Sequence, residues 1–281
     1  MTDVSPEVLN KLAELIKATT SGASAPHEGS TFLEYLKGLT ELVDAIAWPT
    51  AAIICVLLFR PQLTKFLGGV KTVKVFGAEI SREIDSQIEE SAKEAQAKTE
   101  TELRSGPSES ELNRAMVVKN LVADTDGSVI AKQAEALAAE YQQVRDSMLP
   151  GNNRTRAMEV VVSKMRTIGQ AFFPIRHEFA GSSSPGKRLM VIASLEVSPD
   201  YDLLDWLAER VGSEKPFLQY HALVAILLAA QGNKAKAYIR DFDAAVERVN
   251  QFKDKFDGDM SRIGTFDEIK KTVEKLKRGI K

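Results

Sequence analysis

Two histidines are the side chains of this sequence best suited to acid–base chemistry. His177 precedes Glu178, and His221 follows Tyr220 at the start of a strongly apolar segment. An imidazole titrates near neutral pH, so either group has the chemistry of a general acid or base. No serine lies in the Gly-x-Ser-x-Gly context of a hydrolase. We therefore expect His221 to be a histidine at the edge of the core, satisfied by a neighbour, and His177 to be exposed.

Two groups of aspartates have the composition of metal ligands. Asp200, Asp202 and Asp205 lie in Ser-Pro-Asp-Tyr-Asp-Leu-Leu-Asp-Trp, which we interpret as a turn and a helix start. Carboxylates there cap free N–H groups and complement the helix dipole. The second group, in Asp-Lys-Phe-Asp-Gly-Asp at 254–259, lacks EF-hand spacing and the bidentate glutamate. We expect neither group to hold a metal.

The composition excludes several classes of protein and several kinds of site. The chain has 281 residues, one cysteine (Cys55) and three histidines, which excludes an intrachain disulfide framework and any cysteine-rich zinc site. A net charge of −2 gives no bulk attraction to nucleic acid. Neither a P-loop nor a Rossmann glycine set is present. We assign no catalytic, cofactor-binding or metal residue, and because aromatics are only 7%, we expect an all-α fold.

The strongest signal is an apolar run at 42–59, which is free of charge from 45 onward. As a helix this run would be about 27 Å long, close to the roughly 30 Å of a bilayer's hydrocarbon core. Pro49 lies inside it, and membrane helices tolerate proline better than soluble helices do. The sequence predicts a transmembrane segment over 31–60 with its core at 42–59. A buried core helix is the alternative.

The flanks of this run differ in charge. Residues 1–44 hold three lysines against seven acids, whereas 60–77 hold four bases and no acid. Because the basic side of a membrane helix stays in the cytoplasm, we expect a single-pass protein of a bacterial-type inner membrane, with its N-terminus outside. The residues predicted to lie at the membrane interfaces are Trp48, Arg60, Lys65, Lys71 and Lys74.

The rest of the chain divides around the predicted span. Residues 1–30 read as an extracytoplasmic amphipathic helix and a linker, and 61–106 as a basic juxtamembrane segment followed by a charged helix over 78–104. We interpret that helix as a solvated spacer. Residues 107–281 are expected to form a cytoplasmic helical domain, with helices at 131–148 and 154–173 and a final helix that begins near Phe266, capped by Thr265.

One internal similarity appears within that domain. The units 187–211 and 219–249 each contain an apolar helix, a short turn and an amphipathic helix, and the matching core positions lie 34 residues apart: Leu189 with Leu223, and Ile192 with Ile226. The pair resembles HEAT- or armadillo-type repeats over about 65 residues. The resemblance implies stacked helical hairpins, with 154–180 as a possible third unit. A plain helical bundle is the alternative.

These features predict a membrane-anchored interaction module whose helical domain binds a protein partner or a second copy of itself. No nucleic-acid partner is expected. One alternative is a sensor–effector whose oligomerised membrane helices perturb the bilayer when a signal binds, and a pore formed in this way would have Asp44 or Pro49 facing inward. The other is an enzyme of unrecognised class centred on His177 or His221.

Overall fold

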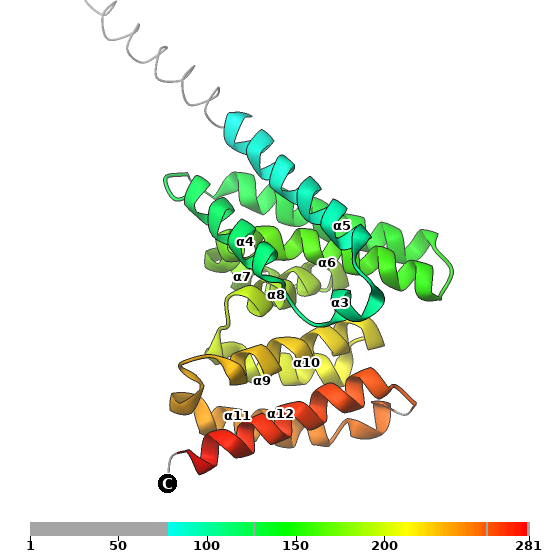
Figure 1. The fold of residues 1–281 in the computed structure, drawn as a ribbon, viewed down its shortest axis with the longest axis vertical. Coiled ribbons are helices and arrows are strands. Elements are labelled where there is room, and N and C mark those ends of the chain that lie inside the picture. The colour runs from blue at the N-terminus through cyan, green and yellow to red at the C-terminus, as the bar shows by residue number, and fades with distance from the viewer. Residues whose placement is uncertain (1–77, 126, 257, 280–281) are drawn as a thin grey trace, which may run out of the picture. The chain divides into compact units, whose positions relative to one another are not determined.

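A computed structural model describes residues 78–125, 127–256 and 258–279 (Figure 1). The chain divides into two compact units, Met1–Lys71 and Thr72–Lys281, and the described residues belong to the second. They form helices and turns without a strand, which confirms the all-α prediction for this part of the chain. No helix in these ranges is long and apolar enough to cross a membrane. The predicted span at 42–59, with Trp48, Arg60, Lys65, Lys71 and Lys74, lies outside the described residues.

The described chain begins with a helix over 78–97. The α-helices that follow are α3 (Glu100–Arg104), α4 (Glu109–Leu121), α5 (Ser128–Ser147), α6 (Asn152–Phe172), α7 (Arg176–Ala180), α8 (Pro185–Val197), α9 (Leu204–Ser213), α10 (Pro216–Gln231), α11 (Ile239–Asn250) and α12 (Met260–Arg278). Short 3-10 helices connect them: η1 (Phe173–Ile175), η2 (Tyr201–Leu203), η3 (Ala235–Tyr238) and η4 (Lys253–Phe256).

These helices stack in two layers. In the first layer α6 packs on α8, α8 on α10, and α10 on α12. The second layer consists of α9 and α11, which pack on each other. The α9 helix also packs on α10 of the first layer, and α11 packs on α12. The α5 helix covers α6 and α8, while α4 covers another side of α6. Figure 1 shows the succession from the green helices near α6 to the red α12. The helix pairs α8–α9 and α10–α11 are the two units with matching sequence.

The matched positions of those units lie in the core. Leu189, Ile192, Leu223 and Ile226 are all buried in one continuous core. Each such side chain contributes on the order of 2 kcal/mol when it leaves water. The α8 helix begins at Pro185 with the Ser184 side chain as its cap. The repeat of apolar helices in the sequence therefore corresponds to a layer of the structure.

The helix predicted at 78–104 is not a solvated spacer. Ile80, Ile84 and Ile88 are buried in the core shared with the later helices, and the hydroxyl of Ser91 lies 2.8 Å from that of Ser163 in α6. The helix also ends at 97, and α3 starts after a capping box formed by Thr99. The isoleucines spaced by four mark a buried face, and only the other faces carry the exposed charges.

The final helix begins six residues earlier than the sequence predicted. The α12 helix starts at Met260, and the Asp259 carboxylate accepts hydrogen bonds from the backbone N–H groups of Ser261 and Arg262. Thr265 lies within the helix, where its hydroxyl donates to the carbonyl of Ser261. A carboxylate that accepts two backbone N–H groups is a strong start signal, so the prediction of Thr265 as the cap was wrong.

Candidate functional site

The two histidines considered for catalysis lie in different surroundings. His177 is exposed on α7, as predicted. His221 lies in α10 and is 0% exposed, so it belongs to the interior rather than to the edge of the core. Its ring nitrogens face two carboxylates: Nδ1 lies 2.9 Å from Glu196 Oε1, and Nε2 lies 3.4 Å from Glu159 Oε2. Glu196 is therefore the neighbour that hydrogen-bonds this histidine, and Glu159 adds an ion pair.

Further charged residues complete a buried cluster around His221. Arg166 Nε donates to Glu196 Oε2 over 2.6 Å, and Arg166 Nη1 lies 3.7 Å from Glu111 Oε1. Glu111 also accepts a hydrogen bond from the hydroxyl of Ser163. Helices α4, α6, α8 and α10 supply these side chains. We call the cluster the charged centre, and it consists of Glu111, Glu159, Arg166, Glu196 and His221.

The electrostatics of the charged centre fix its protonation. Burial by itself would lower the pKa of His221, but the negative charges of Glu159 and Glu196 outweigh it and raise the pKa to about 9. Burial would raise the pKa of Glu196, and the charges of Arg166 and His221 hold it below its usual range. His221 is therefore protonated at neutral pH. An imidazolium cannot accept a proton, so the geometry does not favour His221 as a general base.

Glu159 is the least satisfied member of the charged centre. It is 4% exposed, yet its Oε2 receives no hydrogen bond from the described residues, and His221 Nε2 donates none. The two atoms form an ion pair whose alignment is too poor for a hydrogen bond. Glu159 lies at the edge of a cavity of about 140 Å³, which we call the recess. It is lined by Arg104, Thr155, Glu159, Pro216, Phe217, Tyr220, Asp259 and Ser261.

A second cavity adjoins the recess and is wider. Its volume is about 480 Å³, and it shares Arg104, Tyr220 and Ser261 with the recess. Tyr220 donates its hydroxyl to the Arg104 carbonyl, which ties α10 to α3 where the cavities meet. We call this outer cavity the vestibule. Its remaining lining residues are Glu100, Thr101, Ser105, Met260, Gly264 and Thr265.

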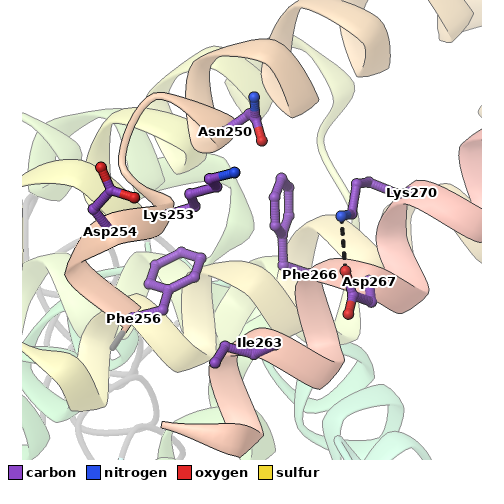
Figure 2. Close-up of a pocket in the computed structure, with 8 residues that line it drawn as sticks. All are labelled: Asn250, Lys253, Asp254, Phe256, Ile263, Phe266, Asp267 and Lys270. Atoms are coloured by element: carbon purple, nitrogen blue, oxygen red, sulfur yellow. Dashed lines mark ion pairs between the residues drawn. The ribbon is translucent and has the colours of Figure 1, made fainter. Parts of the chain in front are cut away.

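A separate groove lies at the C-terminal end of the stack, between η4 and α12 (Figure 2). Its volume is about 460 Å³. We call it the terminal groove, and it is lined by Asn250, Lys253, Asp254, Phe256, Ile263, Phe266, Asp267 and Lys270. Figure 2 shows the ring of Phe266 between the ends of Lys253 and Lys270, and the ion pair between Lys270 and Asp267, which is 2.7 Å long.

The predicted aspartate groups have structural roles. Asp200 accepts a hydrogen bond from the backbone N–H of Asp202 at the start of η2, which confirms the capping interpretation, and it pairs with Arg176. Asp205 forms an ion pair with Arg248. In the described ranges no three His, Cys, Asp or Glu side chains are grouped so that they could hold a metal ion. Of the second group, Asp254 lines the terminal groove and Asp259 caps α12.

Sequence reasoning did not find Glu111, Glu159, Arg166 or Glu196. Glu159, Ser163 and Arg166 recur at helical spacing along α6, which resembles the polar face of an amphipathic helix. In the structure α4 packs on this face of α6, and His221 of α10 lies against Glu159. Most of the second half of α6 is therefore buried. Comparison of the chain with protein-family models, curated proteins and solved structures found no match. Functional inference therefore depends on the geometry.

Proposed function

We propose that this chain is a membrane-anchored helical module whose domain binds a protein partner through the terminal groove. The observation that carries the proposal is an open groove with an apolar floor and a charged rim at the end of the stack. Protein interfaces commonly combine an apolar centre with a polar edge. An apolar or aromatic side chain of the partner would fill the space above Phe256, Ile263 and Phe266.

The rim of the groove has charges available for such a partner. Lys253 and Asp254 are exposed, and neither forms an ion pair with any described residue, whereas Lys270 is already held by Asp267. A partner segment with one apolar side chain flanked by charged residues would complement this rim. Rim charges of this kind act mainly on the rate of association and on specificity.

The arrangement of helix pairs supports an interaction role. Stacked helical hairpins resembling HEAT or armadillo repeats present extended surfaces whose ends and faces are available for binding. The α4 helix adds a second exposed apolar surface, because Leu112, Met116 and Val117 reach solvent and Met116 is 54% exposed. Apolar patches of this kind often mark contacts with other proteins.

Anchoring by the segment 42–59 is part of the proposal. Its support is the uncharged run and the basic flank of Arg60, Lys65, Lys71 and Lys74. The test is to introduce a cysteine at Ser24 or at Ser183 in a Cys55→Ala background and to label intact cells with a membrane-impermeant maleimide. Labelling at position 24 alone supports one span with a cytoplasmic domain. Labelling at both positions or at neither contradicts it.

Site-specific photo-crosslinking in the native host tests the groove. A benzophenone side chain placed at Asn250 on the groove rim should capture one discrete protein. The same group at Ser147, which is exposed at the end of α5, is the matched control. Capture at 147 only, or at neither position, would contradict the proposal. Capture at Met116 instead of Asn250 would move the interface to α4 and exclude the groove.

A sensor–effector is the second candidate function, and the recess beside Glu159 favours it, since such a protein needs a ligand site in its helical domain. This reading predicts that induction of the full chain lowers membrane potential. Leu57→Asp in the predicted span should abolish that loss. An unchanged potential on induction would count against it.

A further inference from the structure

The outer face of α4 gathers most of the large apolar side chains that are exposed in the described residues. Five such side chains reach solvent in these ranges, and three of them, Leu112, Met116 and Val117, lie on α4. A helix that packs on one side normally carries polar residues on its other side. An exposed apolar face that departs from this pattern indicates a contact that the described residues do not supply.

The inner side of α4 holds the outer face in a fixed position. Glu111 is buried in the charged centre, Ala115 and Val118 are buried on the same side, and α4 packs on α6. The side chain of Ser108 accepts a hydrogen bond from the backbone N–H of Glu111 and caps the start of the helix. A partner of the outer face therefore meets a preformed surface, so little conformational freedom is lost when it binds.

Two exposed charges of opposite sign stand at the ends of this face. Glu109 lies in the first turn of α4 and Lys119 in the last, and neither forms an ion pair with any described residue. With about 3.6 residues per turn, both fall on the side of the helix that carries Leu112 and Met116. The outer face therefore has a negative end, an apolar centre and a positive end.

The order of these residues is symmetric about position 114. Leu112 and Met116 lie two positions on either side of it, and Glu109 and Lys119 lie five positions on either side. When two copies of α4 run antiparallel about a two-fold axis at this level, residue 112 meets residue 116 and residue 109 meets residue 119, twice in each pair. Each glutamate then faces a lysine. A parallel pair would instead place like charges together at both ends.

We propose that the outer face of α4 binds the same face of a second copy of this chain. The pair is antiparallel, with Leu112 and Met116 at its centre and Glu109 opposite Lys119 at both ends. Charges at such flanking positions commonly set the orientation of paired helices. The surface is separate from the terminal groove, which is formed by η4 and α12 away from α4 (Figure 1).

The size of the face sets the expected strength of the pair. The α4 helix has 13 residues and is therefore about 20 Å long. Two such helices bury less than the roughly 800 Å² per partner of a standard interface, so we expect a weak dimer with a Kd on the order of 10 µM.

Sedimentation equilibrium of the full chain in a density-matched non-ionic detergent tests the dimer. Met116→Asp brings two carboxylates into the apolar centre and should weaken the dimer by at least about ten-fold. The matched control is Leu149→Asp, because Leu149 is 89% exposed between α5 and α6, and this change should leave the Kd unaltered. Circular dichroism checks that both variants are folded. A chain that stays monomeric far above the expected Kd, or a dimer that Met116→Asp does not weaken, would overturn the proposal.

Charge reversal tests the antiparallel direction. Glu109→Lys places lysine opposite lysine at both ends, and Lys119→Glu places glutamate opposite glutamate, so each should weaken the dimer about ten-fold at low salt. The double variant Glu109→Lys/Lys119→Glu restores opposite charges in an antiparallel pair, and its Kd should return close to that of the unaltered chain. Because the exchange opposes the helix dipole, thermal unfolding checks that the double variant is folded. A folded double variant that dimerises as weakly as the single variants rules out the antiparallel pair.

Photo-crosslinking identifies what covers α4. A benzophenone side chain at Met116 of the full chain in the native host should give a product with twice the mass of the chain, in which both parts are this protein. Capture of a different protein, or a crosslink within one chain to residues 1–77, would overturn the proposal. Capture of a partner from Asn250 tests the terminal groove separately, so failure of the α4 pair and failure of the groove are distinguishable.

Discussion

The charged centre and the terminal groove both place ionisable side chains beside aromatic rings, but they use the charges differently. In the charged centre the ring of Phe217 lies 4.7 Å from that of His221, and every charge is buried among partners from other helices. In the groove Lys270 lies 4.9 Å from the ring of Phe266, and its charge is exposed. Burial, rather than residue type, separates the two regions.

The difference shows which charges constrain the fold and which remain available to a partner. Removing one member of a buried ion pair leaves the other charge uncompensated in a medium of low polarity, at a cost of several kcal/mol. An exposed pair is solvated whether or not it forms, so its loss costs little. The charged centre should therefore tolerate almost no change, while the groove rim should tolerate many.

The largest effect should follow loss of Arg166. Arg166→Met removes the cation that lies between Glu196 and Glu111 and leaves both carboxylates buried. We expect the free energy of unfolding to fall by about 3–5 kcal/mol. The matched control is Arg248→Met, because Arg248 pairs with Asp205 and Glu209 but is 40% exposed, and its loss should cost at most about 1 kcal/mol. Urea unfolding followed by circular dichroism measures both, and equal losses would remove the distinction between the two regions.

A somewhat smaller effect should appear in the dependence of stability on pH. The folded-state pKa of His221 is about 9, against 6.5 for a free imidazole, so the folded protein binds the extra proton between these values. The stabilisation is complete below pH 6.5 and is lost as pH rises through 9, on the order of 3 kcal/mol in total. His221→Gln cannot titrate there and should show a flatter profile from pH 6 to 10. Parallel profiles for the two proteins would mean that His221 is not the titrating group.

Much of the helical framework was predictable because local patterns determine it. The helices at 131–148 and 154–173 correspond to α5 and α6 within a few residues, and the two units with matching Leu189 and Leu223 form helices α8 to α11, of which α8 packs on α10 and α9 on α11. These elements follow from apolar spacing and from stop signals such as the Pro-Gly at 150–151.

The charged centre could not be predicted in the same way. Its members are spread from Glu111 to His221, and each reads locally as an ordinary charge on a helix surface. Only the packing of α4, α8 and α10 around α6 brings them together. The burial of Ile80, Ile84 and Ile88 was missed for the same reason, since the covering helices lie dozens of residues away.

Asp259 and Thr265 can be compared as the cap of α12. Asp259 lines the recess and caps this helix, which also forms one side of the terminal groove. Asp259→Ala removes two hydrogen bonds to backbone N–H groups and the ion pair with Arg262, so we expect a loss of about 1–2 kcal/mol. Thr265→Ala, at the position that the sequence suggested as the cap, should cost about 0.5 kcal/mol or less. Thermal unfolding of the two variants decides between these helix starts, and a greater loss at Thr265 would contradict the observed cap.

The smallest effect on stability is expected at the groove rim, where function should change instead. Lys253→Glu reverses an exposed charge that no described residue pairs with, so the free energy of unfolding should shift by no more than about 0.5 kcal/mol. If the partner's charges face this rim, the same change should weaken binding about 2- to 5-fold, the range set by a single exposed ion pair. The yield of crosslinked partner from position 250 measures it.

Lys132→Glu is the control for that experiment, because Lys132 is an exposed lysine on α5, far along the chain from the groove. Both reversals change the net charge by the same amount, so a general effect of charge on association would lower the two yields equally. A loss confined to Lys253→Glu would locate the interaction at the rim. Equal yields from both variants and the unaltered chain would mean that Lys253, although it pairs with no described residue, does not contribute to recognition.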